Sequence, residues 1–290
     1  MDTPVNNKIK RIKPNATAGK WFSANKALLE TELSSYIENA KIEKLPGRLK
    51  AIISPHAGYT HSGQTAAIAY KHLIDSDLNT FIILAPSHTA YFKGASIPDY
   101  THYETPLGEV SIDLELCSKL LKTEYFNNVK EAHIYEHSLE IQLPFIQMLI
   151  KKDFKIVPIV LSELSSCDFE EIAKLIKNIM NDKTIIIASG DFTHYGENFS
   201  FTPFIDNIRE NISNLDLGAI DLLIKKDFEG FRTYLSDTKA TICGRNPFAL
   251  LTKIFENDET TVKLLDYRLS GDTDADYSLS VSYGALVYYK

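Results

Sequence analysis

The sequence predicts a three-layer α/β/α sandwich around a mixed, largely parallel β-sheet. Two observations carry this prediction. Short, continuous runs of β-branched residues recur along the chain, and longer segments of helical period lie between them. A strand that is apolar throughout is typical of a parallel sheet that is buried on both faces. Strand followed by helix, repeated, is the pattern of a sheet covered by helices on both sides.

The expected elements follow in chain order. Four buried strands are predicted at residues 50–54, 81–85, 155–161 and 184–189. Helices are predicted at residues 25–40, 63–74, 139–150, 168–180 and 206–227, with another beginning near 246–247. Two longer strands are predicted at residues 261–270 and 278–289. Their alternation is weaker, which leaves open whether they form an antiparallel edge of the main sheet or a small side sheet.

The composition is that of an ordinary folded domain. The 290 residues are 44% apolar and 24% charged, which argues against disorder, coiled coil and collagen-like fibre. We expect one domain over residues 1–290, because no repeat or linker interrupts the chain after about the first twenty residues. We expect that N-terminal segment to be poorly structured or loosely packed. The net charge of −7 argues against nucleic-acid binding, which needs clustered Lys and Arg.

The cysteine count and the apolar runs indicate a cytoplasmic protein. The three cysteines form no CxxC pair, which favours a reducing compartment over a secreted disulfide framework. The N-terminus lacks the apolar stretch of a secretory signal. No apolar run reaches the roughly 20 residues that a membrane-spanning helix needs, so membrane insertion is not expected.

Three of the predicted strands lead directly into histidines. His56, His88 and His194 each follow a strand within a few residues, and Asp191 lies close to His194. Ligands of open α/β sheets bind beyond the carboxyl ends of the strands. Imidazole, carboxylate and thiolate are ligands that iron, copper and zinc accept. The pattern therefore indicates a metal or acid–base centre, although each histidine alone is also compatible with an ordinary polar loop.

Cys243 and the segment around Glu136 are further candidates. Cys243 precedes the helix that begins near Asn246, and Arg245 is close, so we expect a lowered thiol pKa that favours a ligand or nucleophile. The alternative is a small buried apolar residue. Glu136 is typical of an acid in the first turn of a helix. His133 and His137 are four residues apart, but the segment before His137 lacks helical periodicity, so we do not predict a metal pair there.

Eight blocks of sequence, taken in order, resemble the Memo family, the mediators of ErbB2-driven cell motility and their microbial relatives. The resemblance extends from Trp21 to the final strand. The blocks are GKWF (19–22), PHAGYTHSG (55–63), PSH (86–88), YETPLGEVSID (103–113), EHSLEIQLPF (136–145), SGDFTHYG (189–196), TICGRNP (241–247) and SVSYGAL (280–286).

The resemblance implies a fold similar to that of the class III (LigB-type) extradiol dioxygenases, which are non-haem iron enzymes. It implies a metal site formed by His56, His88 and Cys243, with Asp191 and His194 adjoining. The expected cofactor is iron or copper, with zinc possible through the same ligands. Cysteine stands where the dioxygenases have a carboxylate, which puts ring-cleaving activity in doubt and favours Cu(I).

Two functions from different classes follow from the resemblance. The first is a metal-dependent redox protein that acts on a small redox substrate in motility and cytoskeletal signalling. In it His194 is the general acid or base and Asp191 orients it. The alternative is a non-enzymatic adaptor that binds a phosphotyrosine-containing peptide in the same pocket, with Arg245 as an anion contact. A zinc hydrolase would use the same ligands. The sequence predicts no oligomeric state.

Overall fold

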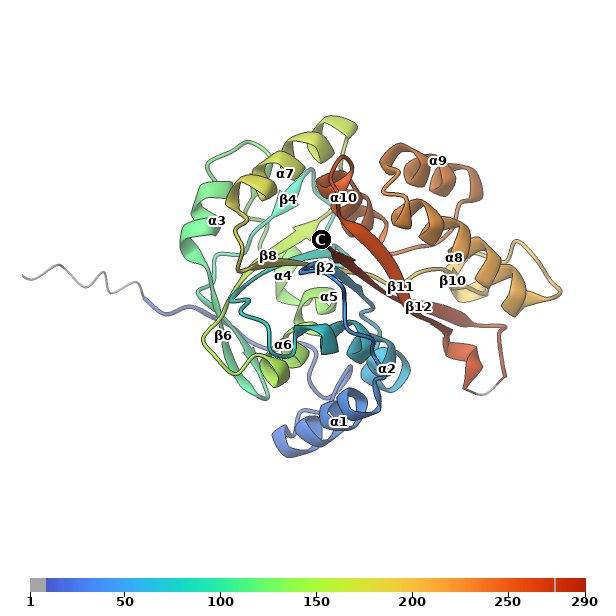
Figure 1. Cartoon of the computed structure of the whole chain (residues 1–290), viewed down its shortest axis with the longest axis horizontal. Coiled ribbons are helices and arrows are strands. Elements are labelled where there is room, and N and C mark those ends of the chain that lie inside the picture. Colours follow the sequence, from blue (N-terminus) through green and yellow to red (C-terminus); the bar gives the residue numbers. More distant parts are fainter. Residues whose placement is uncertain (1–8, 274) are drawn as a thin grey trace, which may run out of the picture.

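One mixed β-sheet, with helices on both faces, organises the chain (Figure 1). The structure, a computed structural model, describes residues 9–273 and 275–290. The main path of strands runs in the order β1-β5-β6-β8-β3-β9-β2-β12-β10, and β11 pairs with β12. The predicted three-layer α/β fold class is confirmed.

The bounds of the elements are as follows. The strands are β1 (Ile12–Lys13), β2 (Leu49–Ser54), β3 (Thr80–Pro86), β4 (Ala95–Ser96), β5 (His102–Thr105), β6 (Gly108–Ile112), β7 (Phe126–Asn127), β8 (Lys155–Leu161), β9 (Thr184–Ser189), β10 (His194–Tyr195), β11 (Thr261–Leu269) and β12 (Ser280–Tyr289). The α-helices are α1 (Lys26–Asn39), α2 (Tyr59–Tyr70), α3 (Leu114–Leu120), α4 (Glu131–Ile134), α5 (His137–Glu140), α6 (Leu143–Leu149), α7 (Ser166–Ile179), α8 (Ile208–Ile224), α9 (Phe228–Thr238) and α10 (Arg245–Phe255). Short 3₁₀ turns lie at Lys71–Leu73, Glu197–Phe199 and Ser270–Asp272.

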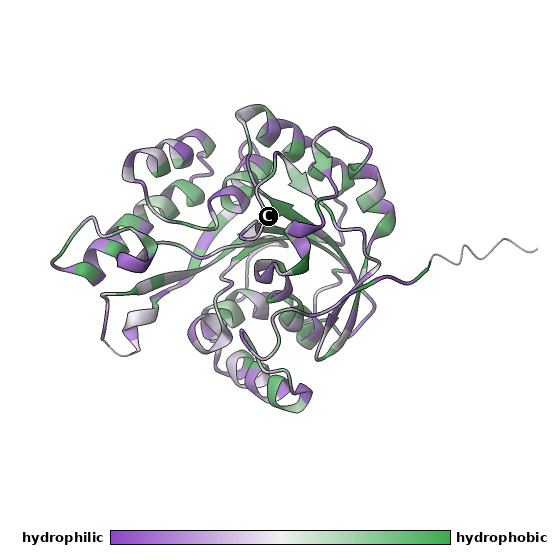
Figure 2. Ribbon diagram, turned by 180° about the vertical axis from the view of Figure 1, so that it is seen from behind, coloured by the Kyte–Doolittle hydropathy of each residue, from purple (hydrophilic) through white to green (hydrophobic). Residues whose placement is uncertain are grey.

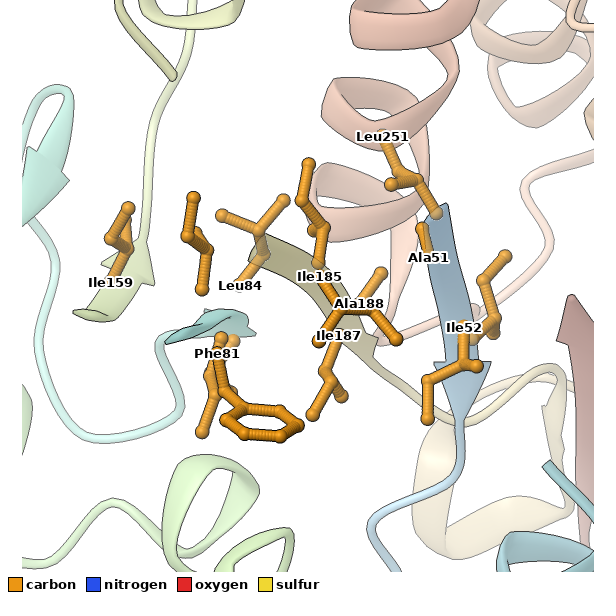
Figure 3. Close-up of a cluster of buried hydrophobic side chains, with 14 of the residues drawn as sticks. Ala51, Ile52, Phe81, Leu84, Ile159, Ile185, Ile187, Ala188 and Leu251 are labelled. Atoms are coloured by element: carbon orange, nitrogen blue, oxygen red, sulfur yellow. The ribbon is translucent and has the colours of Figure 1, made fainter. Parts of the chain in front are cut away.

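The four predicted apolar strands form the parallel centre of the sheet. β8, β3, β9 and β2 lie side by side, with Phe81 of β3 opposite both Ile156 of β8 and Ile185 of β9. Every residue of β3 and β9 is buried. Successive side chains alternate between the two faces, so helices must cover both. In Figure 3, Leu251 of α10 packs on one side of these strands and Phe81 lies on the other.

The helices divide between the two faces. In Figure 1, α7, α9 and α10 lie above the sheet, and α1, α2 and α6 lie below it. Figure 2 shows that apolar residues concentrate in the sheet and that polar residues lie on the outer helix surfaces. The amphipathic helix α7 shows this division in its sequence, because Phe169, Ile172 and Ile176 are buried while its lysines are not.

The C-terminal strands belong to the main sheet, which decides the question that the sequence left open. β12 runs antiparallel to β2, with Leu286 opposite Ile53, and β11 runs antiparallel to β12. The pattern of β11 is weaker than that of the central strands because β11 is only partly buried along most of its length.

The structure has two helices where the sequence predicted one. The prediction of a single helix over residues 139–150 was wrong, because α5 ends at Glu140 and α6 begins at Leu143. Pro144 stands in the first turn of α6, where its missing N–H costs nothing, but a continuous helix would have needed that N–H.

The N-terminal segment is anchored where the structure describes it. Residues 1–8 lie outside the described residues. Ile12 and Lys13 pair with β5, and the buried Lys13 ammonium forms an ion pair with Glu140, which is also buried. The Ala16 N–H (3.0 Å) and the Thr17 hydroxyl (2.8 Å) donate to the same carboxylate. The expectation of loose packing was therefore wrong for residues 12–17. The buried Glu140 carboxylate of α5 needs partners, and Lys13, Ala16 and Thr17 supply them.

Among the described residues, none of the helices is both long enough and apolar enough to cross a bilayer.

Candidate metal centre

The strand order explains why the predicted residues meet. β3, β9 and β2 are consecutive parallel strands, so their carboxyl ends lie at one edge of the sheet. His88 follows β3, Asp191 follows β9 and His56 follows β2. His194 begins β10, and Cys243 directly precedes Gly244, the N-cap residue of α10. The structure brings together all five residues that the sequence singled out.

Two glycines allow the Asp191 and Cys243 loops to approach each other. A Cβ atom built on Gly190 would lie 2.3 Å from the Cα atom of Gly244. The same atom would lie 2.7 Å from the Phe248 ring of α10. A side chain at position 190 would therefore push apart the two segments that carry Asp191 and Cys243.

His56 and Cys243 form the centre of the site. The His56 Nε2 atom lies 3.1 Å from the Cys243 Sγ atom, and the backbone N–H of Asp191 lies 3.2 Å from that sulfur. The Asp191 Oδ1 atom accepts the backbone N–H of His56 at 2.8 Å. Its Oδ2 atom lies 3.9 Å from His56 Nε2. His56 is buried, so these contacts are sheltered from solvent.

A buried carboxylate orients His88. The Glu136 Oε1 atom lies 2.8 Å from His88 Nδ1, and Oε2 accepts the His88 backbone N–H at 2.6 Å. Burial alone raises the pKa of Glu136, but hydrogen bonds and the charge of His88 outweigh it, so this pKa lies below its usual value. The carboxylate therefore accepts the proton of Nδ1, which leaves a lone pair on Nε2. This arrangement is common for metal-binding histidines.

The backbone orients His194 in the same way. Its Nδ1 atom lies 3.0 Å from the carbonyl oxygens of both Phe192 and Thr241. Carbonyl oxygens only accept, so the proton of the neutral ring is on Nδ1 and Nε2 has a free lone pair. Asp216 holds the intervening residue, because its buried carboxylate accepts the backbone N–H (3.1 Å) and the hydroxyl (2.6 Å) of Thr193.

His137 and Trp21 also line the centre, although the sequence analysis did not place them there. The His137 ring centroid lies 4.7 Å from that of His88 and 5.2 Å from that of His56. Trp21 stacks on His137, with ring centroids 4.0 Å apart. His133 lies elsewhere, since its Nε2 atom is 2.9 Å from Ser96 Oγ. The blocks GKWF and EHS contain Trp21 and His137, so the family resemblance held the signal that spacing did not.

Burial favours the neutral form of His56 and of His137. Burial, with the charges of His137 and His88, holds the pKa of His56 well below its ordinary value. Burial and His88 lower the pKa of His137 to about 4. Neutral imidazole is the form that binds metals.

The pKa values of the Cys243 thiol and the Asp191 carboxyl are raised rather than lowered. Burial and then the nearby Asp191 raise the pKa of Cys243 well above its ordinary value. The expectation of a lowered pKa was therefore wrong for the metal-free protein, because desolvation outweighs the helix N-terminus. Burial also raises the pKa of Asp191, against the opposing influence of His194.

The geometry suits a metal ion. Ligand atoms of His56, His88 and Cys243 all lie within 4.8 Å of one another, as do those of Asp191, His194 and Cys243. Two imidazoles and a sulfur are donors that Cu(I), iron and zinc accept. Glu136 and His137 complete a further group with His88, but Glu136 is already engaged by the His88 ring.

A cleft of about 890 Å³ adjoins this cluster. His88 and Cys243 contribute to its lining, and Arg245, Tyr91 and Glu163 also line it. A molecule in the cleft can therefore reach His88 and Cys243.

Comparisons with known proteins identify the family. A family model described as Memo-like protein matches residues 13–287. The chain is 33% identical over 285 residues to "Protein memo-1 homolog" of Caenorhabditis elegans, covering 94% of this chain and 81% of that protein. It is 33% identical over 287 residues to "Protein MEMO1" of Xenopus laevis, covering 94% and 96%. It is 32% identical over 276 residues to "MEMO1 family protein" of Methanosarcina acetivorans, covering 94% and 97%. The chain belongs to the Memo family.

Proposed function

We propose that this protein binds iron or copper through His56, His88 and Cys243 and uses the metal in redox chemistry on a small substrate. The observation that carries the proposal is the mutual approach of two imidazoles and one sulfur within 4.8 Å. The Nδ1 atom of His88 is engaged by the protein, so its Nε2 atom is free to bind. Zinc accepts the same donors, and elemental analysis of the purified protein decides between the metals.

The chain's own groups would handle binding and proton transfer. A bound iron or copper ion would supply a one-electron couple. The His194 ring is held through Nδ1, and its Nε2 atom would hold or release a proton. Asp191 would orient the site through its hydrogen bond to the His56 backbone. The adjoining cleft would admit the substrate past His88.

Cys243→Ser tests the ligand assignment. Serine is nearly isosteric but a poor ligand for Cu(I), so Cu(I) affinity should fall strongly while the fold is kept. Cys167→Ser is the matched control, because Cys167 is exposed and distant from the cluster in the sequence. Anaerobic competition titrations with Cu(I) and Fe(II) measure the effect. Unchanged affinity in Cys243→Ser, or in a variant with alanine at all three proposed ligands, would contradict the proposal.

A second candidate is a non-enzymatic adaptor that holds a phosphotyrosine-containing peptide. The cleft beside Cys243 favours it, because Arg245 contributes to the lining and guanidinium groups bind phosphate in a bidentate manner. The test compares a phosphorylated peptide with its dephosphorylated twin, in the natural protein and in Arg245→Gln. Equal affinity for the two peptides would exclude the adaptor.

The cellular setting is part of the same proposal. We propose a cytoplasmic protein of motility and cytoskeletal signalling on the basis of its family membership. Fractionation of cells that express a tagged chain tests the location, and a motility assay after its depletion tests the role.

A further inference from the structure

We infer that Ser189 sets the tautomer of His56, so that the bare Nε2 atom of His56 faces Cys243. Ser189 is then a positioning residue for the metal centre, and Gln142 in turn orients Ser189. The inference about the tautomer depends only on the hydrogen bonds described below. Its consequence for metal affinity rests on the proposed function.

A backbone carbonyl fixes the orientation of the Gln142 amide. Gln142 Nε2 lies 3.0 Å from the carbonyl oxygen of Pro55 and 2.8 Å from Ser189 Oγ. Since a carbonyl oxygen only accepts, the amide nitrogen must face Pro55. The Gln142 Oε1 atom then accepts the Tyr70 hydroxyl at 2.7 Å. Both hydrogens of the Gln142 amide are used, one on Pro55 and one on Ser189.

A second carbonyl fixes the proton of Ser189. The Ser189 Oγ atom lies 2.6 Å from the carbonyl oxygen of Ser138, so the hydroxyl must donate there. The oxygen already accepts one hydrogen from Gln142. Its remaining neighbour is His56 Nδ1, at 3.1 Å. Ser189 has no proton left for this contact and can only accept, so His56 must carry its proton on Nδ1.

The consequence for the centre is specific. With the proton on Nδ1, the lone pair of His56 is on Nε2, which lies 3.1 Å from the Cys243 sulfur. The opposite tautomer would place two lone pairs, on Nδ1 and on Ser189 Oγ, against each other.

The network is sheltered from solvent. Tyr70, Gln142, Ser138 and Ser189 are each at most 1% exposed. The network joins β9 and β2, which are far apart in the sequence. Ser189 ends β9 and lies opposite Ser54, the last residue of β2, and His56 follows Ser54 by two residues. A buried network whose polar groups are all paired holds one arrangement, because each unpaired group is costly.

Nitrogen NMR of the metal-free, ¹⁵N-histidine-labelled protein tests the tautomer directly. The two ring nitrogens of a neutral imidazole have distinct shifts, so the protonated atom can be assigned. We expect the His56 proton on Nδ1 in the natural protein and in Ser189→Thr, which keeps the hydroxyl. In Ser189→Ala the signal should shift toward the other tautomer. Ser96→Ala is the matched control, because Ser96 is a buried serine whose hydroxyl contacts His133, so it should move His133 signals only.

Cu(I) affinity gives the second measurement. Removing the group that orients a metal-binding histidine lowers affinity by about 10- to 100-fold, so Ser189→Ala should show this loss and Ser189→Thr should not. A proton on Nε2 of His56 in the natural protein would overturn the tautomer assignment, and Cu(I) affinity unchanged in a folded Ser189→Ala variant would overturn the positioning role of Ser189. If Ser189→Ala does not fold, the spectra of the natural protein and of Ser189→Thr still decide. A protein that binds no metal but shows the Nδ1 proton would refute the proposed function and leave the tautomer assignment standing.

Discussion

The buried ion pair between Lys13 and Glu140 offers a sharp test of how the N-terminal strand is held. Lys13 is 1% exposed and Glu140 is fully buried. In Lys13→Met the carboxylate would keep only its bonds from Ala16 N and Thr17 Oγ1. Removing one partner of a buried pair costs about 3–5 kcal/mol, because an uncompensated charge stays in a poorly solvated place. Each 1.36 kcal/mol is a factor of ten, so the unfolding constant should rise by roughly two to nearly four powers of ten.

The double variant Lys13→Met, Glu140→Gln separates charge from packing. Glutamine is neutral, and its oxygen can still accept the Ala16 and Thr17 hydrogens. We therefore expect the double variant to recover about 2 kcal/mol or more relative to Lys13→Met, since the isolated charge is gone.

Urea unfolding, followed by circular dichroism, measures both free energies. Lys119→Met is the matched control, because the Lys119–Glu115 pair is exposed on both sides and should contribute little to stability. A loss below about 1 kcal/mol in Lys13→Met, or a double variant no more stable than the single one, would refute the reasoning.

Three other outcomes are expected. Glu136→Gln should lower Cu(I) affinity about 10- to 100-fold, because it removes an acceptor of His88. Glu131→Gln is the control, because Glu131 is exposed, and it should leave the affinity unchanged. Equal effects of the two variants in Cu(I) titrations would contradict this prediction. Burial lowers the pKa of His133 to about 3, so folding excludes its proton and stability should fall as pH drops below about 6.5, by about 1.4 kcal/mol per pH unit from this group. Urea unfolding repeated at several pH values measures this dependence, and the free energy of unfolding should change less steeply with pH in His133→Gln. Equal slopes in the variant and the natural protein would contradict the prediction. Gly190→Ala should lower the free energy of unfolding by about 1–3 kcal/mol and weaken metal binding, because the new Cβ atom would meet the Gly244 backbone. Thermal melting and Cu(I) titration measure the two effects, and values equal to those of the natural protein would contradict the prediction.

The centre of the sheet could be predicted because its strands are apolar on both faces. The predicted bounds of β8 and β9 agree with the structure, those of β2 differ by one residue at its start, and those of β3 differ by one residue at each end. The hairpin of β5 and β6 was missed, because Glu104 and Glu109 are exposed and the pattern is too polar to indicate a strand. The split between α5 and α6 was missed because the apolar spacing continues through Pro144.

For the candidate site, spacing along the chain indicated the ends of strands but not the side chains that support them. His56, His88 and Asp191 could be found because each follows a strand. Ser189 and Gln142 could not, since a buried serine and an amide carry no periodic signal, and their role depends on directions of hydrogen bonds. The raised pKa of Cys243 was also out of reach, because it depends on how deeply α10 and the Asp191 loop enclose the sulfur.

The position of β12 has a consequence for how the chain is made. β12 is the last element in chain order, yet it lies beside β2, whose end carries His56. The backbone of Lys290 also pairs with Arg48 in both directions. During synthesis β2 must therefore wait with one edge open while more than two hundred residues are added between Ser54 and Ser280. A ribosome-bound chain that stops before β12 would expose that edge to other nascent chains.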